Sequence, residues 1–166
     1  MLNALKKFFR DPIFIKKKAF LKSLPLFSDL KDKDLGHLIE ALHSRIYHEG
    51  EVLFLEGDIG RALFIVESGR VELTKKDSSG KPRPLAMLGP GDFFGEMALL
   101  EHLPRSASAV VTEKSHIHLL YRSRIEPIMH YQPNIGMSIM RHLAQLLSAR
   151  LRKATQDERP TNSPLG

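Results

Sequence analysis

Apolar residues recur at helical spacing near both ends of the chain and at strand spacing between them. Asp11 followed by Pro12 predicts the start of a helix over residues 12–23, because Asp caps a first turn and Pro fits the first helical position. A second helix is predicted over residues 32–42, since its apolar positions share one face. These positions are Leu35, Leu38, Ile39 and Leu42.

Between residues 45 and 121 the pattern changes to short apolar runs separated by turn residues roughly every ten positions. The turn signals are Glu49-Gly50, Gly57-Asp58, Ser68-Gly69, Ser78-Ser79-Gly80 and Gly89-Pro90-Gly91. Ser68 and Gly69 separate the runs 62–66 and 71–74, which predicts a hairpin at that point. Repeated short strands of this kind are typical of a β-sandwich or a β-barrel.

Helical spacing returns after residue 121. A short helix is predicted over residues 122–130 and a long one over residues 133–154. The apolar stripe of the long helix consists of Ile135, Ile139, Leu143, Leu146, Leu147 and Leu151. Residues 155–166 are polar and contain proline, so we expect them to form a disordered tail.

Composition and charge narrow the class of protein. Of the 166 residues, 42% are hydrophobic and 27% are charged, and there is no Cys, which excludes disulfides and thiol catalysis. The net charge of +6 lies in residues 1–24, which carry seven Lys or Arg and one Asp, while the rest of the chain is neutral. The basic pI therefore marks an N-terminal segment rather than a nucleic-acid-binding domain. No apolar run has the length of a membrane span, and we expect a cytoplasmic protein.

The strongest chemical signal is the segment 93–110. Gly95 is predicted to end a strand and to open a turn of helix whose unpaired amides attract an anion. Arg105 adds a permanent cation with a fork of donors suited to phosphate oxygens. Glu96 would repel a phosphate, so we expect its carboxylate to accept from a different group, such as a ribose 2′-hydroxyl. The pattern favours a ligand with a cyclised phosphate next to a ribose.

This segment resembles the phosphate-binding cassette of cyclic-nucleotide-binding domains, as in the catabolite activator protein, the regulatory subunits of protein kinase A and cyclic-nucleotide-gated channels. The resemblance is carried by Phe94-Gly95-Glu96-Met97-Ala98-Leu99 and by Pro104-Arg105-Ser106-Ala107-Ser108-Ala109. Other runs resemble the family's strands and turns in the same order, namely Gly50-Glu51-Val52-Leu53-Phe54, Glu56-Gly57-Asp58, Leu63-Phe64-Ile65-Val66, Ser68-Gly69-Arg70-Val71-Glu72 and Gly89-Pro90-Gly91-Asp92.

The resemblance implies a mainly β fold with flanking α-helices: an eight-stranded jelly-roll β-barrel with N-terminal helices and a long C-terminal helix. It divides the chain into a basic N-terminal helical extension, 1–23, a cyclic-nucleotide-binding domain, 24–154, and the tail, 155–166. Within the domain we expect the barrel at 44–121 and the C-terminal helices at 122–154.

The resemblance also implies roles for individual residues. Arg105 is expected to bind the cyclic phosphate, and Glu96 is expected to accept from the ribose 2′-hydroxyl. Backbone amides for the phosphate are expected from Gly95, Met97 and Ala98. The other expected ligand-binding residues are Phe94, Ser106 and Ala107. The candidates to cap the base are Leu147 and Arg150. The ligand is expected to be cAMP or cGMP, which Ser106 does not distinguish.

We interpret the chain as a non-catalytic cyclic-nucleotide sensor, not an enzyme, that regulates a separate partner protein through movement of its terminal helices. The chain stops soon after the long helix, so we expect no helix-turn-helix domain and no DNA partner. One alternative is a protein-interaction module of the same fold that does not bind nucleotide, which the presence of Glu96 and Arg105 disfavours. Another is a cupin-type metalloenzyme.

Two features leave further questions open. His116 and His118 alternate on a predicted strand and share one face, but no Glu follows at a suitable spacing, so we expect exposed histidines and no metal. Residues 1–22 could pack on the barrel, dock to an acidic partner or attach weakly to anionic lipid, with packing favoured for 12–23. The long C-terminal helix is also a candidate contact for a homodimer.

Overall fold

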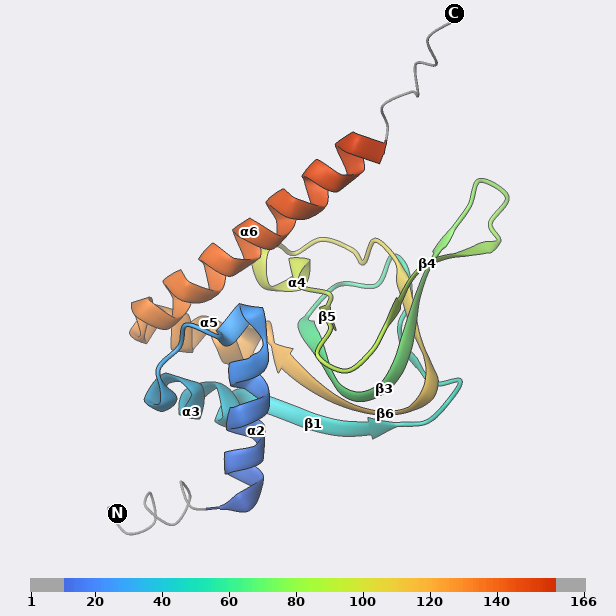
Figure 1. The fold of residues 1–166 in the computed structure, drawn as a ribbon. Helices are drawn as coiled ribbons and strands as arrows, with labels where there is room; N and C mark the ends of the chain where they lie inside the picture. Colours follow the sequence, from blue (N-terminus) through green and yellow to red (C-terminus); the bar gives the residue numbers. More distant parts are fainter. Residues whose placement is uncertain (1–10, 158–166) are drawn as a thin grey trace, which may run out of the picture.

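The structure, a computed structural model, describes residues 11–157 and consists of a curved β-barrel with all of its longer helices gathered on one side (Figure 1). Residues 1–10 of the predicted N-terminal extension and residues 158–166 of the predicted tail lie outside the described residues. The element order is α2 (Pro12–Ser23), a 3-10 turn η1 (Pro25–Phe27), α3 (Asp32–Ala41), β1 (Leu42–Tyr47), β2 (Val52–Phe54), β3 (Ala62–Lys76), β4 (Pro82–Leu88), β5 (Phe93–Phe94), α4 (Met97–Leu100), β6 (Ser108–Tyr121), α5 (Arg122–Tyr131) and α6 (Pro133–Asp157).

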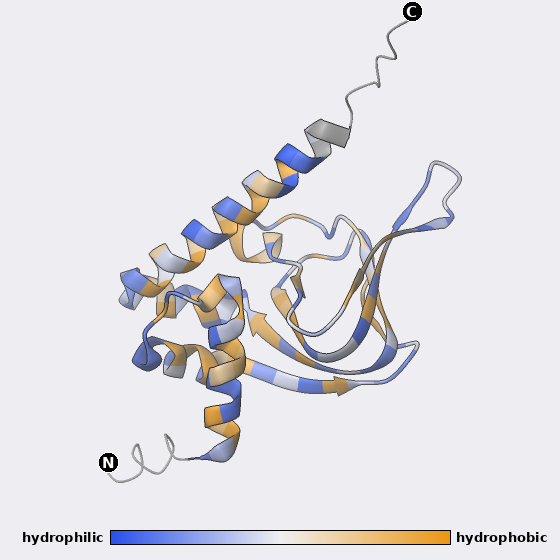
Figure 2. Ribbon diagram, viewed as in Figure 1, coloured by the Kyte–Doolittle hydropathy of each residue, from blue (hydrophilic) through white to orange (hydrophobic). Residues whose placement is uncertain are grey.

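The helices predicted over 12–23, 32–42, 122–130 and 133–154 are all present, and the first begins where its predicted cap places it. The Asp11 carboxylate accepts from the Ile13 amide at 2.8 Å, with Pro12 in the first turn of α2. The long helix α6 continues to Asp157, so the expectation of disorder from residue 155 is wrong for its first three residues. The ribbons of α2, α3 and α6 each carry hydrophobic and hydrophilic segments, as expected of helices with one buried face (Figure 2).

The barrel is built around two long strands. β3 and β6 pair antiparallel along most of their length, and the sheet order is β1-β6-β3-β4, with β2 paired to β6 and β5 paired to β3. Six strands are assigned within the described residues, so the count of eight is not confirmed, although the mainly β architecture with flanking helices is. β3 and β6 each curve around the barrel as one long strand, where several shorter strands were expected (Figure 1).

The predicted hairpin at Ser68 and Gly69 is wrong, because β3 runs through both residues without reversing. Gly69 has a φ of +88°, and the register with β6 shifts on either side of Ser68. A glycine with positive φ serves a β-bulge as readily as a turn. A side chain at Gly69 would also clash with Ser115 on β6, which explains why this bulge requires glycine.

Alternation along β3 creates two buried clusters. Phe64 and Val66 face the barrel interior, whereas Leu63 and Ile65 face the helices on the outer side. The helical cluster also contains Leu99 of α4 and three residues of α6, Ile135, Ile139 and Leu143. The short helix of the candidate cassette is therefore packed into the same core as the C-terminal helix.

Candidate functional site

A pocket of about 300 Å³ opens between the barrel and the second half of α6. The predicted cassette supplies most of its wall, together with apolar residues from β2, β3 and β4. Its apolar lining includes Phe54, Leu73, Ala86, Leu88 and Phe93. Its polar and charged lining includes Glu96, Glu101, Arg105, Ser106 and Arg150. All eight residues predicted to bind ligand line this one pocket.

Gly95 makes the turn from β5 into α4. Its φ of +72° lies in the region that glycine adopts without strain. A Cβ at this position would clash with Nη1 of Arg105 and lie 3.2 Å from the carbonyl oxygen of Ala62. The position therefore needs glycine both for its backbone conformation and for the close approach of the arginine.

Arg105 is held in place by carbonyl oxygens and aromatic rings. Nη1 donates to the Gly95 carbonyl at 3.2 Å, and Nη2 donates to the Ala62 carbonyl at 2.8 Å. The guanidinium carbon lies 4.2 Å from the ring centroid of Phe54, which is cation–π distance. Burial lowers the pKa of Arg105, while Asp58 and Glu96 oppose that shift. The side chain stays charged at neutral pH, because the ordinary pKa of arginine is so high.

The Arg105 side chain also retains donors for a ligand. A guanidinium has five N–H groups, and the two hydrogen bonds to Gly95 and Ala62 use one from each terminal nitrogen. Nε is buried and has no hydrogen-bond partner within residues 11–157. An unpaired buried donor of this kind is costly, so the arrangement is suited to an anion that accepts from it.

The backbone of Arg105 is fixed by the loop at Gly57 and Asp58, for which the sequence predicted a turn but no role in binding. The Arg105 amide donates to the Asp58 carbonyl at 2.7 Å, and the Gly57 amide donates to the Arg105 carbonyl at 2.9 Å. Ile59 and Pro104 form an isolated β-bridge beside them. The turn signal at Gly57 and Asp58 was visible in the sequence, but its pairing with the cassette was not.

Glu96 lies at the base of the pocket and is only 3% exposed. Its Oε1 accepts from Nη1 of Arg150, which comes from α6. Arg150 is therefore at the pocket, as predicted for a capping residue, whereas Leu147 is half-buried on α6 and does not line the pocket. Glu96 and Arg105 carry opposite charges on the same wall of the pocket.

The other predicted residues differ in how they contribute. Phe94 is buried and stacks on Phe64 with ring centroids 5.2 Å apart, so it supports the pocket from the barrel core. The Ala98 amide donates to the Gly95 carbonyl at 3.1 Å and is therefore used within the turn itself. Met97 is partly exposed at the pocket edge, and Ser106 and Ala107 follow Arg105 along its wall.

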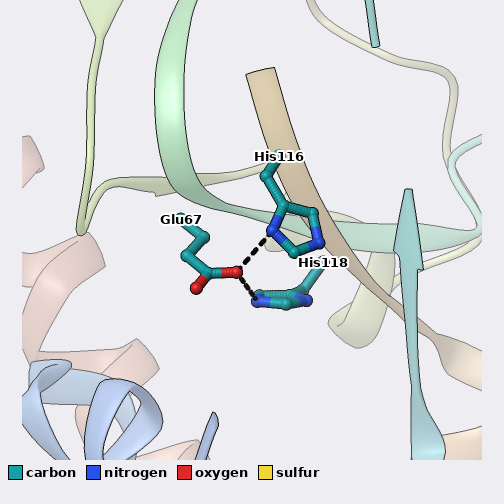
Figure 3. Close-up of side chains that lie close together, drawn as sticks. All are labelled: Glu67, His116 and His118. Carbon is teal, nitrogen blue, oxygen red and sulfur yellow. Dashed lines mark ion pairs between the residues drawn. The ribbon is translucent and has the colours of Figure 1, made fainter. Parts of the chain in front are cut away.

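The prediction that His116 and His118 are exposed is wrong. His118 is fully buried and His116 is partly buried, on the outer face of β6. A carboxylate does lie beside them, because Glu67 approaches both rings from β3 (Figure 3). Sequence spacing along one strand could not reveal it, since strand pairing brings Glu67 to this place. The cluster shares no residue with the pocket.

The pocket offers a cationic donor fork, a buried acceptor and an apolar wall within one space. The fork suits a phosphate, the carboxylate suits a hydroxyl group, and the apolar wall suits the face of a base or another flat ring. Within the described residues, no helix is long and apolar enough to cross a membrane.

Comparisons with known proteins agree with this arrangement. Residues 44–132 match the family model of the cyclic nucleotide-binding domain. The chain is 38% identical to the cyclic AMP receptor protein of Thermus thermophilus over 134 residues, which cover 81% of this chain and 60% of the relative. It is 38% identical to a cAMP-dependent protein kinase regulatory subunit of Yarrowia lipolytica over 111 residues, which cover 67% of this chain and 29% of the relative.

A solved structure extends the similarity over nearly the whole fold. A cyclic nucleotide-binding domain from Methylobacillus flagellatus superimposes with a TM-score of 0.77 at 26% identity, covering 94% of this chain and 88% of that one. The two curated relatives are longer than this chain, which spans less than two thirds of either of them.

Proposed function

This chain belongs to the family of cyclic nucleotide-binding domains, a regulatory and non-catalytic family, and from that premise we propose that it senses cAMP or cGMP and regulates a separate protein. The observation that carries the proposal is the meeting of Arg105 and Glu96 in one pocket of about 300 Å³. Their chemistry matches the two polar parts of a cyclic nucleotide, the charged phosphate and the ribose hydroxyl.

The phosphate binds at Arg105. Its free N–H groups, including the unpaired Nε, provide donors, and its two bonds to carbonyl oxygens keep the guanidinium in position. The surroundings are partly buried, so a charge-assisted hydrogen bond to a phosphate oxygen is less screened than on the surface. The positive φ of Gly95 lets the backbone approach this guanidinium closely.

The ribose binds at Glu96. One carboxylate oxygen, Oε1, accepts from Arg150, which leaves Oε2 to accept from the 2′-hydroxyl. The bond to Arg150 also orients the buried carboxylate toward the pocket. Arg150 lies beside the base as part of the cap, and the apolar wall of Leu73, Ala86 and Leu88 packs against the rings of the base.

Ligand binding is transmitted to the helices through contacts of the cassette. Leu99 of α4 belongs to the same buried cluster as Ile139 of α6. Arg122, at the start of α5, donates to the Glu101 carbonyl at 2.8 Å, just after α4. A small shift of the cassette therefore changes the packing of both C-terminal helices, and a ligand selects the packing that it binds more tightly.

The regulated partner binds the exposed part of α6. Met137 and Leu151 are 72% and 66% exposed on this helix, and Arg150 links the same helix to the ligand pocket. A second copy of the chain, in a homodimer, would use the same surface. Weak contact of residues 1–22 with anionic lipid stays a prediction, and the first ten of those residues lie outside the described chain.

Calorimetric titration of the full 166-residue chain with cAMP, cGMP and linear 5′-AMP tests the proposal. One cyclic nucleotide should bind with a stoichiometry of one and the linear nucleotide much more weakly, because its phosphate does not fit between Arg105 and the ribose site. Failure of both cyclic nucleotides to bind at millimolar concentration would contradict the proposal and favour an interaction module of the same fold.

A further inference from the structure

Three side chains that are natural metal ligands meet on the outer face of the barrel: Glu67, His116 and His118 (Figure 3). Their nearest ligand atoms all lie within 4.8 Å of one another. His116 Nδ1 is 2.6 Å from Oε2 of Glu67, and His118 Nε2 is 3.1 Å from the same oxygen. This is the tightest grouping of its kind in the part of the chain that the structure describes.

The strands hold these side chains together for two separate reasons. His116 and His118 are two residues apart on β6, so their rings point to the same face, with centroids 5.0 Å apart. Glu67 lies on β3 at the shift in register between Val66, which pairs with Ile117, and Ser68, which pairs with His116. Glu67 is two residues beyond Ile65, which pairs with His118, so alternation along β3 turns the carboxylate to the same face as the two rings.

The buried histidine is oriented by a neighbouring strand. His118 Nδ1 lies 2.8 Å from the hydroxyl of Ser44 on β1, so this nitrogen is engaged. Nε2 contacts the Glu67 carboxylate but lacks the alignment of a hydrogen bond, and it is a buried atom without a hydrogen-bond partner. A metal-binding histidine usually has one ring nitrogen held by a neighbouring group and the other free to bind the ion, and His118 has its Nδ1 held and its Nε2 available in this way.

We propose that Glu67, His116 and His118 bind a divalent transition-metal ion of the Zn²⁺ class. Two imidazoles and one carboxylate form a common ligand set for this ion, with a water molecule in the fourth position. Ligand bonds of about 2.0–2.2 Å place ligand atoms about 3–4 Å apart, so only small rotations of the side chains are needed. His116 is the ligand nearest to solvent and gives the ion its path of entry.

The site lies at the junction of the barrel with α2. Lys16 of α2 contacts Oε1 of Glu67 at 3.2 Å, and Phe20 of α2 packs 5.7 Å from the His118 ring. Lys16 is therefore the cation that now balances the carboxylate, and a metal ion would take its place. Metal occupancy thus changes the polar contact between α2 and the barrel, separately from ligand in the nucleotide pocket.

The test adds Zn²⁺ alone, which measures affinity, or Co²⁺ alone, which reports the coordination geometry. Each ion is added near neutral pH to the full chain without a polyhistidine tag. The wild-type chain should bind one equivalent of Zn²⁺, and Co²⁺ should give the visible absorption of a four- or five-coordinate site. Glu67→Gln and His116→Ala should each weaken Zn²⁺ binding about 100-fold, since even loss of an outer contact costs about 10- to 100-fold. Ser44→Ala, which changes only such an outer contact, should weaken it about 10-fold.

A variant that strengthens Zn²⁺ binding distinguishes the loss of a metal ligand from general damage to the fold. Lys16→Gln removes the competing cation from an exposed position, so Zn²⁺ should bind several-fold more tightly. Lys33→Gln and His130→Ala, both at exposed positions away from the site, should bind as the wild type does. No binding by the wild type at micromolar Zn²⁺, or binding that survives both Glu67→Gln and His116→Ala, would overturn the proposal.

Discussion

The guanidinium of Arg150 donates to the buried carboxylate of Glu96, although 54 residues separate them along the chain. Glu96 is 3% exposed and belongs to the cassette, whereas Arg150 comes from the exposed second half of α6. The last helix is therefore attached to the ligand pocket through one charged side chain. In the function proposed above, this bond is one contact through which a bound nucleotide would act on α6.

Replacing Arg150 with Ala should weaken cyclic-nucleotide binding about 10-fold, because the cap is lost and Glu96 is left without its partner. Arg150 is a better target than removal of α6, since Ile135, Ile139 and Leu143 of that helix are core residues. Calorimetry gives the affinity. The control is Arg152→Ala on the same helix, whose side chain bonds to Ser148 and to no other described residue. Equal loss in both variants would argue against a specific role for Arg150.

Glu96→Ala should abolish discrimination between a cyclic nucleotide and its 2′-deoxy form. With the wild type, removing the 2′-hydroxyl should cost about 10- to 100-fold in affinity, the usual effect of a hydrogen bond to a charged group. In the variant the two ligands should bind about equally. Competition binding with both ligands measures the four affinities, and discrimination that persists in the variant would show that another group contacts the hydroxyl.

Gly95→Ala should weaken ligand binding at least about 10-fold and also lower thermal stability. The substitution forces a side chain into a positive φ, at a cost of about 1–2 kcal/mol, and pushes against Nη1 of Arg105. Gly89→Ala is the matched control, because a Cβ there meets no atom within 4 Å. Thermal unfolding and ligand titration of the pair measure both effects. If Gly95→Ala binds like Gly89→Ala, Arg105 does not depend on this close approach.

Without metal, the protein should lose stability as the pH falls below about 6.5. Burial lowers the pKa of His118 from 6.5 to about 4. The unfolded chain therefore binds a proton at His118 at a higher pH than the folded chain does. As the pH falls from 6.5 toward about 4, the free energy of unfolding decreases. Thermal unfolding in the presence of a chelator, from about pH 7 to about pH 5, measures this slope.

The control for this slope is His130→Gln, which changes an exposed histidine and should retain the full pH dependence. His118→Gln should be less stable at neutral pH but should show a shallower slope, since the buried titrating group is gone. A slope that is the same in all three proteins would mean that His118 does not control the acid sensitivity in this range.

Local signals in the sequence predicted local structure well. The cap at Asp11 and the apolar spacing of α3 are short-range features, and both helices begin where they were expected. Glu96 and Arg105 lie nine residues apart in one segment, so their meeting in one pocket depends on a single turn and a short helix. A resemblance along that segment was sufficient to predict which residues would line one pocket, whereas their roles in binding stay a prediction.

The features that could not be predicted from the sequence depend on pairing between distant strands. Ser68 and Gly69 signal a positive φ, which both a hairpin and a bulge can use, and only pairing with β6 decides for the bulge. The same pairing brings Glu67 to His118, a contact that no spacing along one strand can reveal. Arg150 was predicted as a cap, but its bond to Glu96 depends on the path of α6 across the cassette.

The proposed function depends above all on Arg105 holding the cyclic phosphate, and titration of Arg105→Lys beside the wild type is the sharpest test of this role. Lysine keeps the positive charge but loses the donor fork and the bonds to Gly95 and Ala62. If Arg105 holds the phosphate, the wild type binds cAMP or cGMP and Arg105→Lys binds about 10- to 100-fold more weakly, while the exposed Arg124→Lys is unchanged. Equal affinity of Arg105→Lys and the wild type would contradict it.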